Sequence, residues 1–297
     1  MTKNGSLFGT MRMPFLILTP ACVAVGVGTA YRQTHALNGF HVLLVLLGAL
    51  ASHVCVNVLN EYFDWKSGLD ARTTPTPFSG GSGTLPENPA MQRSVLLLGM
   101  GALAATALIG MYFVWLRGWP LLPLGIAGLL LLVTYTVWLV YDPVLCLIAP
   151  GLGFGVLMVM GTHYCLTGTY GWGPFVASLV PTFLVSALLL LNQFPDVEAD
   201  RSVGRRHFPI TIGRRASAIV YGVLLLLTYL SVFTGLALDL LPPWSLLALI
   251  TSVPAWLAYR GAYRNADNVP ALIPSMGLNV LVNITAPILL ALGLLIS

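Results

Sequence analysis

Long apolar runs alternate with short polar stretches along the whole chain. Runs of about 20 residues, the length that a helix needs to cross a bilayer, occur near 14–31, 40–63, 94–116, 119–141, 144–166, 173–194, 216–236, 243–260 and 273–296. The pattern predicts nine transmembrane helices. The fold class that we expect is therefore an all-α integral membrane protein, with residues 1–297 as a single membrane domain.

The composition supports this prediction and excludes a soluble domain. Of the 297 residues, 57% are hydrophobic and only 8% are charged, whereas soluble domains carry about 25% charged residues. The mean hydropathy is +0.85. The four cysteines lie in apolar runs without CxxC spacing, which favours unpaired core thiols over a metal or disulfide role. The chain shows no nucleic-acid-binding signature.

The placement of the basic residues predicts the orientation in the membrane, because cytoplasmic loops carry an excess of Lys and Arg. With the N-terminus in the cytoplasm, all but two of the 14 Lys and Arg residues lie inside, and the exceptions are Arg32 and Arg117. The C-terminus then faces outside. Two long polar loops, 65–93 and 195–215, both face the cytoplasm.

Most of the acidic residues are concentrated at two places, after the second and the sixth predicted helices. They are Glu61, Asp64, Asp70, Asp196, Glu198 and Asp200. Asn60 and Asp64 are four positions apart and so share one face of a helix. Asp196 and Asp200 repeat this spacing. Because carboxylates beside a membrane are costly, two such rows of oxygen ligands indicate a site for Mg²⁺, which completes its shell with water and phosphate oxygens.

Basic side chains close to these acids complete the expected site. Arg and Lys bind the oxygens of a diphosphate, and we expect this role for Lys66, Arg72, Arg201 and Arg205. Surface ion pairing is the expectation for the more distant Arg214, Arg215, Arg260 and Arg264. Pro195 is expected to break or kink the sixth helix beside the acids.

The two acidic stretches resemble the two Asp-rich motifs of the UbiA superfamily of intramembrane prenyltransferases. The first reads NEYFDWKSGLD (60–70), and the second reads DVEAD (196–200) followed by RSVGRR. The resemblance extends from the first predicted helix to the ninth. It implies helices around a central cavity with a cytoplasmic cap. Because the second and sixth helices run the same way, we also expect two parallel four-helix halves plus one helix.

The resemblance implies Mg²⁺-dependent transfer of a polyprenyl group from an allylic diphosphate to an aromatic acceptor. The motifs are most similar to those of 1,4-dihydroxy-2-naphthoate polyprenyltransferases of menaquinone synthesis, which implies a prokaryotic-type inner membrane. No obligatory protein partner is evident from the sequence. The implied metal ligands are Asn60, Asp64, Asp196 and Asp200. Glu61 is a weaker candidate, because it stands where the family usually has Asp and its arm is longer. The expected catalytic residues are Asp64, Lys66 and Asp70.

Aromatic residues supply the expected walls of the pocket, since an aromatic face stabilises a carbocation without reacting with it. We expect Tyr135, Tyr141 and His163 to contact the acceptor or the prenyl chain. Core packing or an interfacial aromatic belt is the alternative for each. The loop 73–89 is rich in Gly, Ser and Pro. It is expected to cap the site, with a flexible connector as the alternative.

Other interpretations of the residues remain open. The same chemistry could act on 4-hydroxybenzoate, homogentisate, a haem vinyl group or a glycerol-phosphate lipid, because the motifs do not separate these acceptors. A divalent-cation transporter would place its acids near the bilayer midplane, whereas these lie at one face with basic neighbours suited to an anion. A non-catalytic quinone-binding subunit is a further alternative.

Overall fold

The computed structural model describes residues 6–297, and within this range every regular element is helical. Eight stretches are long and apolar enough to cross a membrane: Met13–Thr34, Gly39–Lys66, Pro89–Arg117, Trp119–Val137, Pro143–Thr167, Trp172–Asn192, Arg214–Ala237 and Val269–Leu295. They coincide with eight of the predicted spans. The chain is therefore an integral membrane protein with the all-α fold that its pattern predicts.

The remaining predicted span, 243–260, differs from the prediction. It consists of a 3₁₀ segment, Pro243–Thr251, followed by the α-helix α13, Ser252–Arg264. Pro254 has no N–H to donate to the carbonyl of the preceding turn, so the α-helix begins with this proline in its first turn. Both parts pack against the last helix, α14 (Val269–Leu295).

The remaining elements complete the bundle. The long helices are α2 (Leu18–Thr34), α3 (Gly39–Lys66), α5 (Gln92–Arg117), α6 (Leu122–Val137), α9 (Trp172–Asn192) and α12 (Arg214–Ala237). Between α6 and α9, α7 (Pro143–Leu152) and α8 (Met158–Thr167) are joined by a π-helical turn, Gly153–Leu157. The short helices are α1 (Leu7–Thr10), α4 (Thr84–Glu87), α10 (Val197–Ser202) and α11 (Phe208–Thr211).

Polar side chains explain where two of these helices begin. Asn38 accepts a hydrogen bond from the His41 N–H at the start of α3, at 3.2 Å. Asp142 accepts from the Val144 N–H at the start of α7, at 2.9 Å. Each side chain satisfies a backbone donor that has no partner inside the helix.

The core lies where the long helices pack in pairs, α2 along α14, α3 along α5 and α9 along α12. The π-helical turn approaches α9 closely. A Cβ on Gly155 would lie 1.9 Å from Thr182 Oγ1, so only glycine fits at this contact. Turns of this kind are frequent at functional sites, and this one borders the cavity described below.

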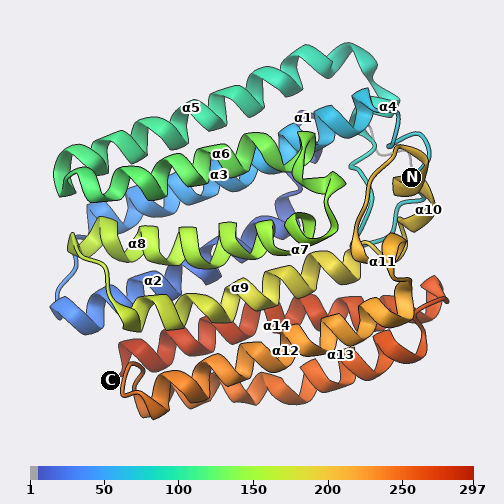
Figure 1. Ribbon diagram of the computed structural model, residues 1–297. Helices are drawn as coiled ribbons and strands as arrows, with labels where there is room; N and C mark the ends of the chain where they lie inside the picture. Colours follow the sequence, from blue (N-terminus) through green and yellow to red (C-terminus); the bar gives the residue numbers. More distant parts are fainter. Residues whose placement is uncertain (1–5) are drawn as a thin grey trace.

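The two long polar loops meet at one end of the bundle. Figure 1 shows α1, α4, α10 and α11 gathered at that end, with the C-terminus at the opposite end. The first acidic motif is at the end of α3 and the second follows α9, and these two helices run in the same direction and both finish there, as the sequence predicts. The fold therefore brings the two motifs together.

Candidate active site

The first acidic motif lies at the end of α3, where Asn60 and Asp64 are one turn apart. After the helix ends, Gly68 adopts a left-handed φ of 76°, a conformation that glycine reaches without steric cost. The chain turns back so that the Leu69 N–H donates to the Asp64 carbonyl at 3.0 Å. This turn brings Asp70 into the same chamber as Asp64.

The second acidic motif follows α9, which ends at Asn192. Pro195 lies in the turn that follows, where the sequence predicts a break in the helix. Asp196 precedes α10, and its carbonyl accepts from the Asp200 N–H at 2.8 Å. The two carboxylates are therefore one helical turn apart, as their spacing predicts.

Both motifs line a single polar chamber of about 140 Å³. The residues that the sequence indicated above and that line it are Asn60, Asp64, Asp70, Tyr135, Asp196, Asp200 and Arg205, and Asn192 at the end of α9 lines it as well. The chamber is also lined by Phe78 and Ser79, which belong to the loop 73–89 that is expected to cap the site. Further lining residues, for which the sequence indicated no role in the site, include Arg12, Gln193 and His207. The chamber therefore combines acids, amides and two guanidinium groups in a small volume.

Arg205 joins the two motifs. Its Nη2 binds Asp64 Oδ1, and its Nη1 lies 3.1 Å from Asp200 Oδ1. Only 14% of the Arg205 side chain is exposed, so water screens these pairs weakly. Burial opposes the charge, but the carboxylates of Asp64 and Asp200 outweigh it and raise the pKa of Arg205 further above its usual value. A charged, planar donor group is thus fixed among the acids.

His207 holds the other side of Asp200. Its Nε2 lies 3.0 Å from Asp200 Oδ2, and the ring is buried. Among the described residues, Nδ1 has no hydrogen-bond partner. Asp200 is therefore fixed from two sides, by Arg205 and by His207. The sequence signal for this histidine was its position directly after the basic sequel of the second motif.

Asp70 and Asp196 make fewer polar contacts. The Ser79 hydroxyl donates to Asp196 Oδ1 at 3.4 Å, and Asp70 Oδ2 is buried without a partner among the described residues. Burial, followed by the nearby Glu61 carboxylate, raises the pKa of Asp70 to about 7. Burial, followed by the Asp200 carboxylate, raises the pKa of Asp196 to about 7. Both acids therefore favour binding a proton or a cation near neutral pH.

Glu61 is separated from the other acids of its motif by its contacts. Its fully buried carboxylate accepts from the Ser82 N–H, at 3.1 Å to Oε1 and 3.0 Å to Oε2. The Ser82 hydroxyl also donates to Oε1. Arg12 Nη2 lies 3.7 Å from Oε2. Glu61 is thus engaged by the loop after α3 and is absent from the lining of the chamber.

The structure places most of the predicted diphosphate-binding side chains outside the chamber. Lys66 is exposed at the end of α3. Arg72 donates to the Ser202 carbonyl and hydroxyl at 3.2 and 3.0 Å. Arg201 pairs at 3.2 Å with an exposed glutamate of its own helix. Of this predicted set, Arg205 is the member that contacts the acids.

The predicted aromatic residues are also separated by the fold. Tyr135 lines the chamber. Tyr141 is 42% exposed and lines neither the chamber nor the cavity below it. His163 is buried in α8 with Nδ1 3.0 Å from Thr29 Oγ1 of α2, which is an interhelical contact away from the chamber.

Arg12 is the second guanidinium of the site, although sequence reasoning used it only to assign orientation. It lines the polar chamber and also the apolar cavity described next. Its Nε is buried without a partner among the described residues. No local spacing relates Arg12 to the acidic motifs, because tertiary packing alone brings it to them. The available signal was a lone arginine, two positions before Pro14 and in front of the first apolar run.

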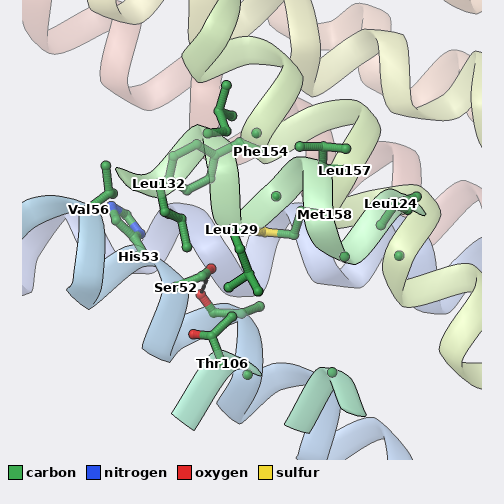
Figure 2. Close-up of a pocket in the computed structure, with 18 of the residues that line it drawn as sticks. Ser52, His53, Val56, Thr106, Leu124, Leu129, Leu132, Phe154, Leu157 and Met158 are labelled. Atoms are coloured by element: carbon green, nitrogen blue, oxygen red, sulfur yellow. Dashed lines mark hydrogen bonds between the residues drawn. The ribbon is translucent and has the colours of Figure 1, made fainter. Parts of the chain in front are cut away.

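An apolar cavity of about 460 Å³ continues from the polar chamber between the long helices. The two spaces share the lining residues Arg12, Asn60, Phe78, Tyr135, Leu189 and Asn192. Figure 2 shows Leu129, Leu132, Phe154 and Met158 around the cavity, with Ser52 and His53 on the side of α3. The combined space suits an amphiphile with an anionic head and a long apolar tail.

The residues of the chamber fit Mg²⁺ in their donor chemistry. Within residues 6–297, no group of three or more His, Cys, Asp or Glu side chains is already arranged to hold a metal ion. Mg²⁺ binds through one or two carboxylates together with substrate phosphates, so it does not need such a group. Asp70 Oδ2 and Asn192 Oδ1 are buried oxygens without a partner in the described part of the chain, and both residues line the chamber.

Comparison with known proteins gives relatives over nearly the whole chain. The chain is 26% identical over 285 residues to a 1,4-dihydroxy-2-naphthoate octaprenyltransferase of Bacillus subtilis, covering 94% of this chain and 89% of the relative. It is 25% identical over 297 residues to a 1,4-dihydroxy-2-naphthoate octaprenyltransferase of Haemophilus influenzae, covering 97% of this chain and 95% of the relative.

Solved structures share the fold at low sequence identity. A UbiA homolog from Aeropyrum pernix K1 matches with a TM-score of 0.73 at 15% identity, covering 95% of this chain and 98% of the homolog. A UbiA homolog from Archaeoglobus fulgidus bound to DMAPP and Mg²⁺ matches with a TM-score of 0.57 at 14% identity, covering 94% of this chain and 98% of the homolog. The UbiA prenyltransferase family matches residues 19–295, so this chain belongs to that family and is a prenyltransferase.

Proposed function

We propose that this prenyltransferase moves a polyprenyl group from an allylic diphosphate to the aromatic ring of 1,4-dihydroxy-2-naphthoate, in menaquinone biosynthesis. The observation that carries the proposal is the continuity of the polar chamber with the apolar cavity, which share Arg12, Asn60 and Tyr135. A diphosphate in the chamber would leave its isoprenoid tail in the cavity. The reacting carbon would then lie at their junction.

Arg205 and Arg12 are the chamber residues suited to the diphosphate. Arg205 presents a charged fork between the two motifs, and forks of this kind bind phosphate oxygens in pairs. The buried and unpartnered Nε of Arg12 is a further donor at the junction. These two groups would orient the donor and hold the charge that develops on the leaving diphosphate.

The oxygens of Asn60, Asp64, Asp196 and Asp200 would hold Mg²⁺ together with the diphosphate. When bound, Mg²⁺ supplies positive charge to the diphosphate oxygens as the allylic C–O bond weakens. Asn192 and Asp70 add uncommitted oxygens to the same chamber. This donor set supports a magnesium requirement.

The proposed reaction exchanges one bond for another without a redox step. The C–O bond between the prenyl carbon and the diphosphate breaks, and its electron pair leaves with the diphosphate. An electron-rich ring carbon of the acceptor donates a pair to form the new C–C bond. The ring becomes aromatic again by releasing a proton or, at a carboxylated carbon, carbon dioxide. Tyr135 lines the junction, where an aromatic face stabilises the allylic cation without capturing it.

The relatives support the choice of acceptor, because both bacterial proteins described above are named for 1,4-dihydroxy-2-naphthoate. The distribution of Lys and Arg supports an orientation with the N-terminus and the chamber at the cytoplasmic side and the C-terminus outside. With this orientation, the water-soluble naphthoate and the diphosphate head would reach the chamber from the cytoplasmic side. The two bacterial relatives support a prokaryotic-type inner membrane as the location.

The test is prenyl transfer by the purified protein in lipid nanodiscs. Labelled geranylgeranyl diphosphate and Mg²⁺ are supplied with either 1,4-dihydroxy-2-naphthoate or 4-hydroxybenzoate, with and without EDTA. We expect product from the naphthoate alone, and its loss with EDTA or in Asp64→Asn. The matched control is Glu198→Gln, which changes an exposed acid beside the second motif and should retain activity.

Each result decides a different part of the proposal. Product from 4-hydroxybenzoate alone would contradict the acceptor and leave the donor chemistry in place. Product that survives EDTA would contradict the role of Mg²⁺. A folded protein that transfers the prenyl group to neither acceptor would contradict the proposed function.

A further inference from the structure

The loop after α3 contacts acids of both motifs over a few residues, 79–84, which we call the cap segment. The Ser79 hydroxyl donates to Asp196 in the second motif. At Gly81, an added Cβ would lie 2.6 Å from Asp70 Oδ1, so its backbone lies directly against that carboxylate. Ser82 binds Glu61. The cap segment therefore crosses the chamber from one motif to the other.

Glu61 makes the strongest of these contacts. Its carboxylate accepts the Ser82 N–H with both oxygens, at 3.1 and 3.0 Å, and accepts the Ser82 hydroxyl with Oε1. The side chain has no exposed surface. Hydrogen bonds to a charged acceptor are stronger than neutral ones. A single residue of α3 thus fixes both the backbone and the side chain of the cap segment.

The N-terminal residues are hydrogen-bonded to the cap segment and to α3. Thr84 Oγ1 donates to the Ser6 carbonyl at 3.1 Å, and Asn57 Nδ2 of α3 donates to the Met11 carbonyl at 3.0 Å. Arg12, which follows directly, faces Glu61 at 3.7 Å. Displacement of the cap segment would therefore also disturb the position of Arg12 at the junction.

We propose that Glu61 is a positioning residue that latches the cap segment over the chamber through Ser82, and that it is not a metal ligand. Its carboxylate is fully engaged by the cap segment and Arg12. Its arm, longer than that of aspartate, is what reaches the loop. The closed cap segment retains the donor diphosphate, and this consequence rests on the proposed function. The contact between Glu61 and Ser82 that holds the segment closed does not depend on which reaction the protein catalyses.

Two substitutions of Glu61 distinguish the effect of side-chain length on the latch from the effect of side-chain charge. Glu61→Asp keeps the charge and shortens the arm, whereas Glu61→Gln keeps the length and removes the charge. Ser82→Ala removes the hydroxyl from the other side of the contact and leaves Glu61 unchanged. The control is Glu198→Gln, the exposed acid described above. All variants are made in the full chain and reconstituted in nanodiscs.

The direct readout is hydrogen–deuterium exchange of the cap segment without substrate. The Ser82 amide donates to Glu61, so its exchange reports the latch itself. A charged hydrogen bond changes an opening equilibrium about tenfold or more. We therefore expect exchange over residues 79–84 to accelerate by about tenfold in Glu61→Asp and Glu61→Gln, with a smaller acceleration in Ser82→Ala.

The second readout is the kinetic pattern. A latch variant should raise the KM for geranylgeranyl diphosphate about tenfold while the half-saturating Mg²⁺ concentration and kcat change little. The Glu61→Gln and Ser82→Ala effects on KM should be non-additive in the double variant, because both remove one contact.

Three outcomes would overturn the latch. The first is unchanged hydrogen–deuterium exchange of the cap segment in both Glu61 variants. This result would contradict the latch whatever reaction the protein catalyses. The second is a rise in half-saturating Mg²⁺ with donor KM unchanged, which is the behaviour of a metal ligand. Additive effects in the double variant are the third. If a Glu61 variant does not fold, exchange and donor KM in Ser82→Ala decide alone, and normal values there would contradict the proposal.

Discussion

Enlarging one glycine of the apolar cavity should shorten the prenyl chain that the protein accepts. Gly128 of α6 lines the cavity, and a Cβ built on it meets no atom within 4 Å. A leucine at this position therefore extends into the cavity. Gly128 is two turns of α6 from Tyr135, about 10 Å along the axis at about 1.5 Å per residue. It lies beyond the first isoprene unit of a donor whose head is in the chamber.

The size of the effect follows from the apolar surface that the donor can no longer bury. The leucine side chain is roughly as large as one isoprene unit. At about 0.8 kcal/mol for each methylene group, losing that burial costs about 3 kcal/mol. This is on the order of a 100-fold fall in kcat/KM for geranylgeranyl diphosphate. Dimethylallyl diphosphate, whose tail ends before Gly128, should keep its kcat/KM within about threefold.

The assay compares kcat/KM for the two donors in Gly128→Leu and in the unsubstituted protein. The control is Gly101→Leu in α5, at an exposed glycine that does not line the cavity and has no atom within 4 Å of an added Cβ. Both substitutions improve helix propensity, so a difference between them reports the cavity. Equal losses for the long and the short donor, or no loss for either, would refute the assignment of the cavity to the prenyl tail.

The site makes two further predictions. Because burial raises the pKa of Asp70 and of Asp196 to about 7, protons compete with Mg²⁺ below that pH. The half-saturating Mg²⁺ concentration should therefore fall as pH rises from about 6 to about 8, and a constant value in an activity titration would contradict this reading. Arg12→Ala should raise the donor KM about tenfold, because a charged hydrogen bond is lost. Lys66→Ala and Arg201→Ala, which change exposed cations, should alter it by less than about twofold; a larger effect at Lys66 than at Arg12 would contradict the position of the chamber.

The acidic part of the site could be predicted from the sequence because its geometry is local. Asn60 and Asp64 share a helix face through their spacing alone, and the same holds for Asp196 and Asp200. The direction of α3 and α9 follows from the number of spans between them. These facts were sufficient to predict that the two motifs meet at one end of the bundle.

The basic residues show that closeness to the acids in the sequence does not predict contact with them in the structure. Lys66 is two positions from Asp64, and residues so spaced do not face the same side of a helix. Arg201 follows Asp200 by one position and lies on the solvent side, beside Glu198. Arg205 reaches the acids because Gly204, at φ 81°, turns the chain back, a conformation that glycine adopts without steric cost.

Other parts of the site depend on long-range packing. Arg12 is brought to the chamber by contacts of the N-terminal residues with α3, such as that of Asn57 with Met11. Glu61 is drawn to Ser82 by the path of a loop. The 3₁₀ geometry of Pro243–Thr251 could likewise not be predicted from the sequence, because hydropathy does not distinguish a 3₁₀ helix from an α-helix.

The measurement that tests the central claim most directly is a crystal structure of the protein with Mn²⁺ and a non-hydrolysable geranylgeranyl diphosphate analogue. Anomalous scattering would locate the metal, and the electron density would locate the tail. The account predicts Mn²⁺ between the two acidic motifs, the diphosphate beside Arg205, and the tail past Gly128 within the cavity. A metal outside the chamber, or a tail outside the cavity, would contradict it.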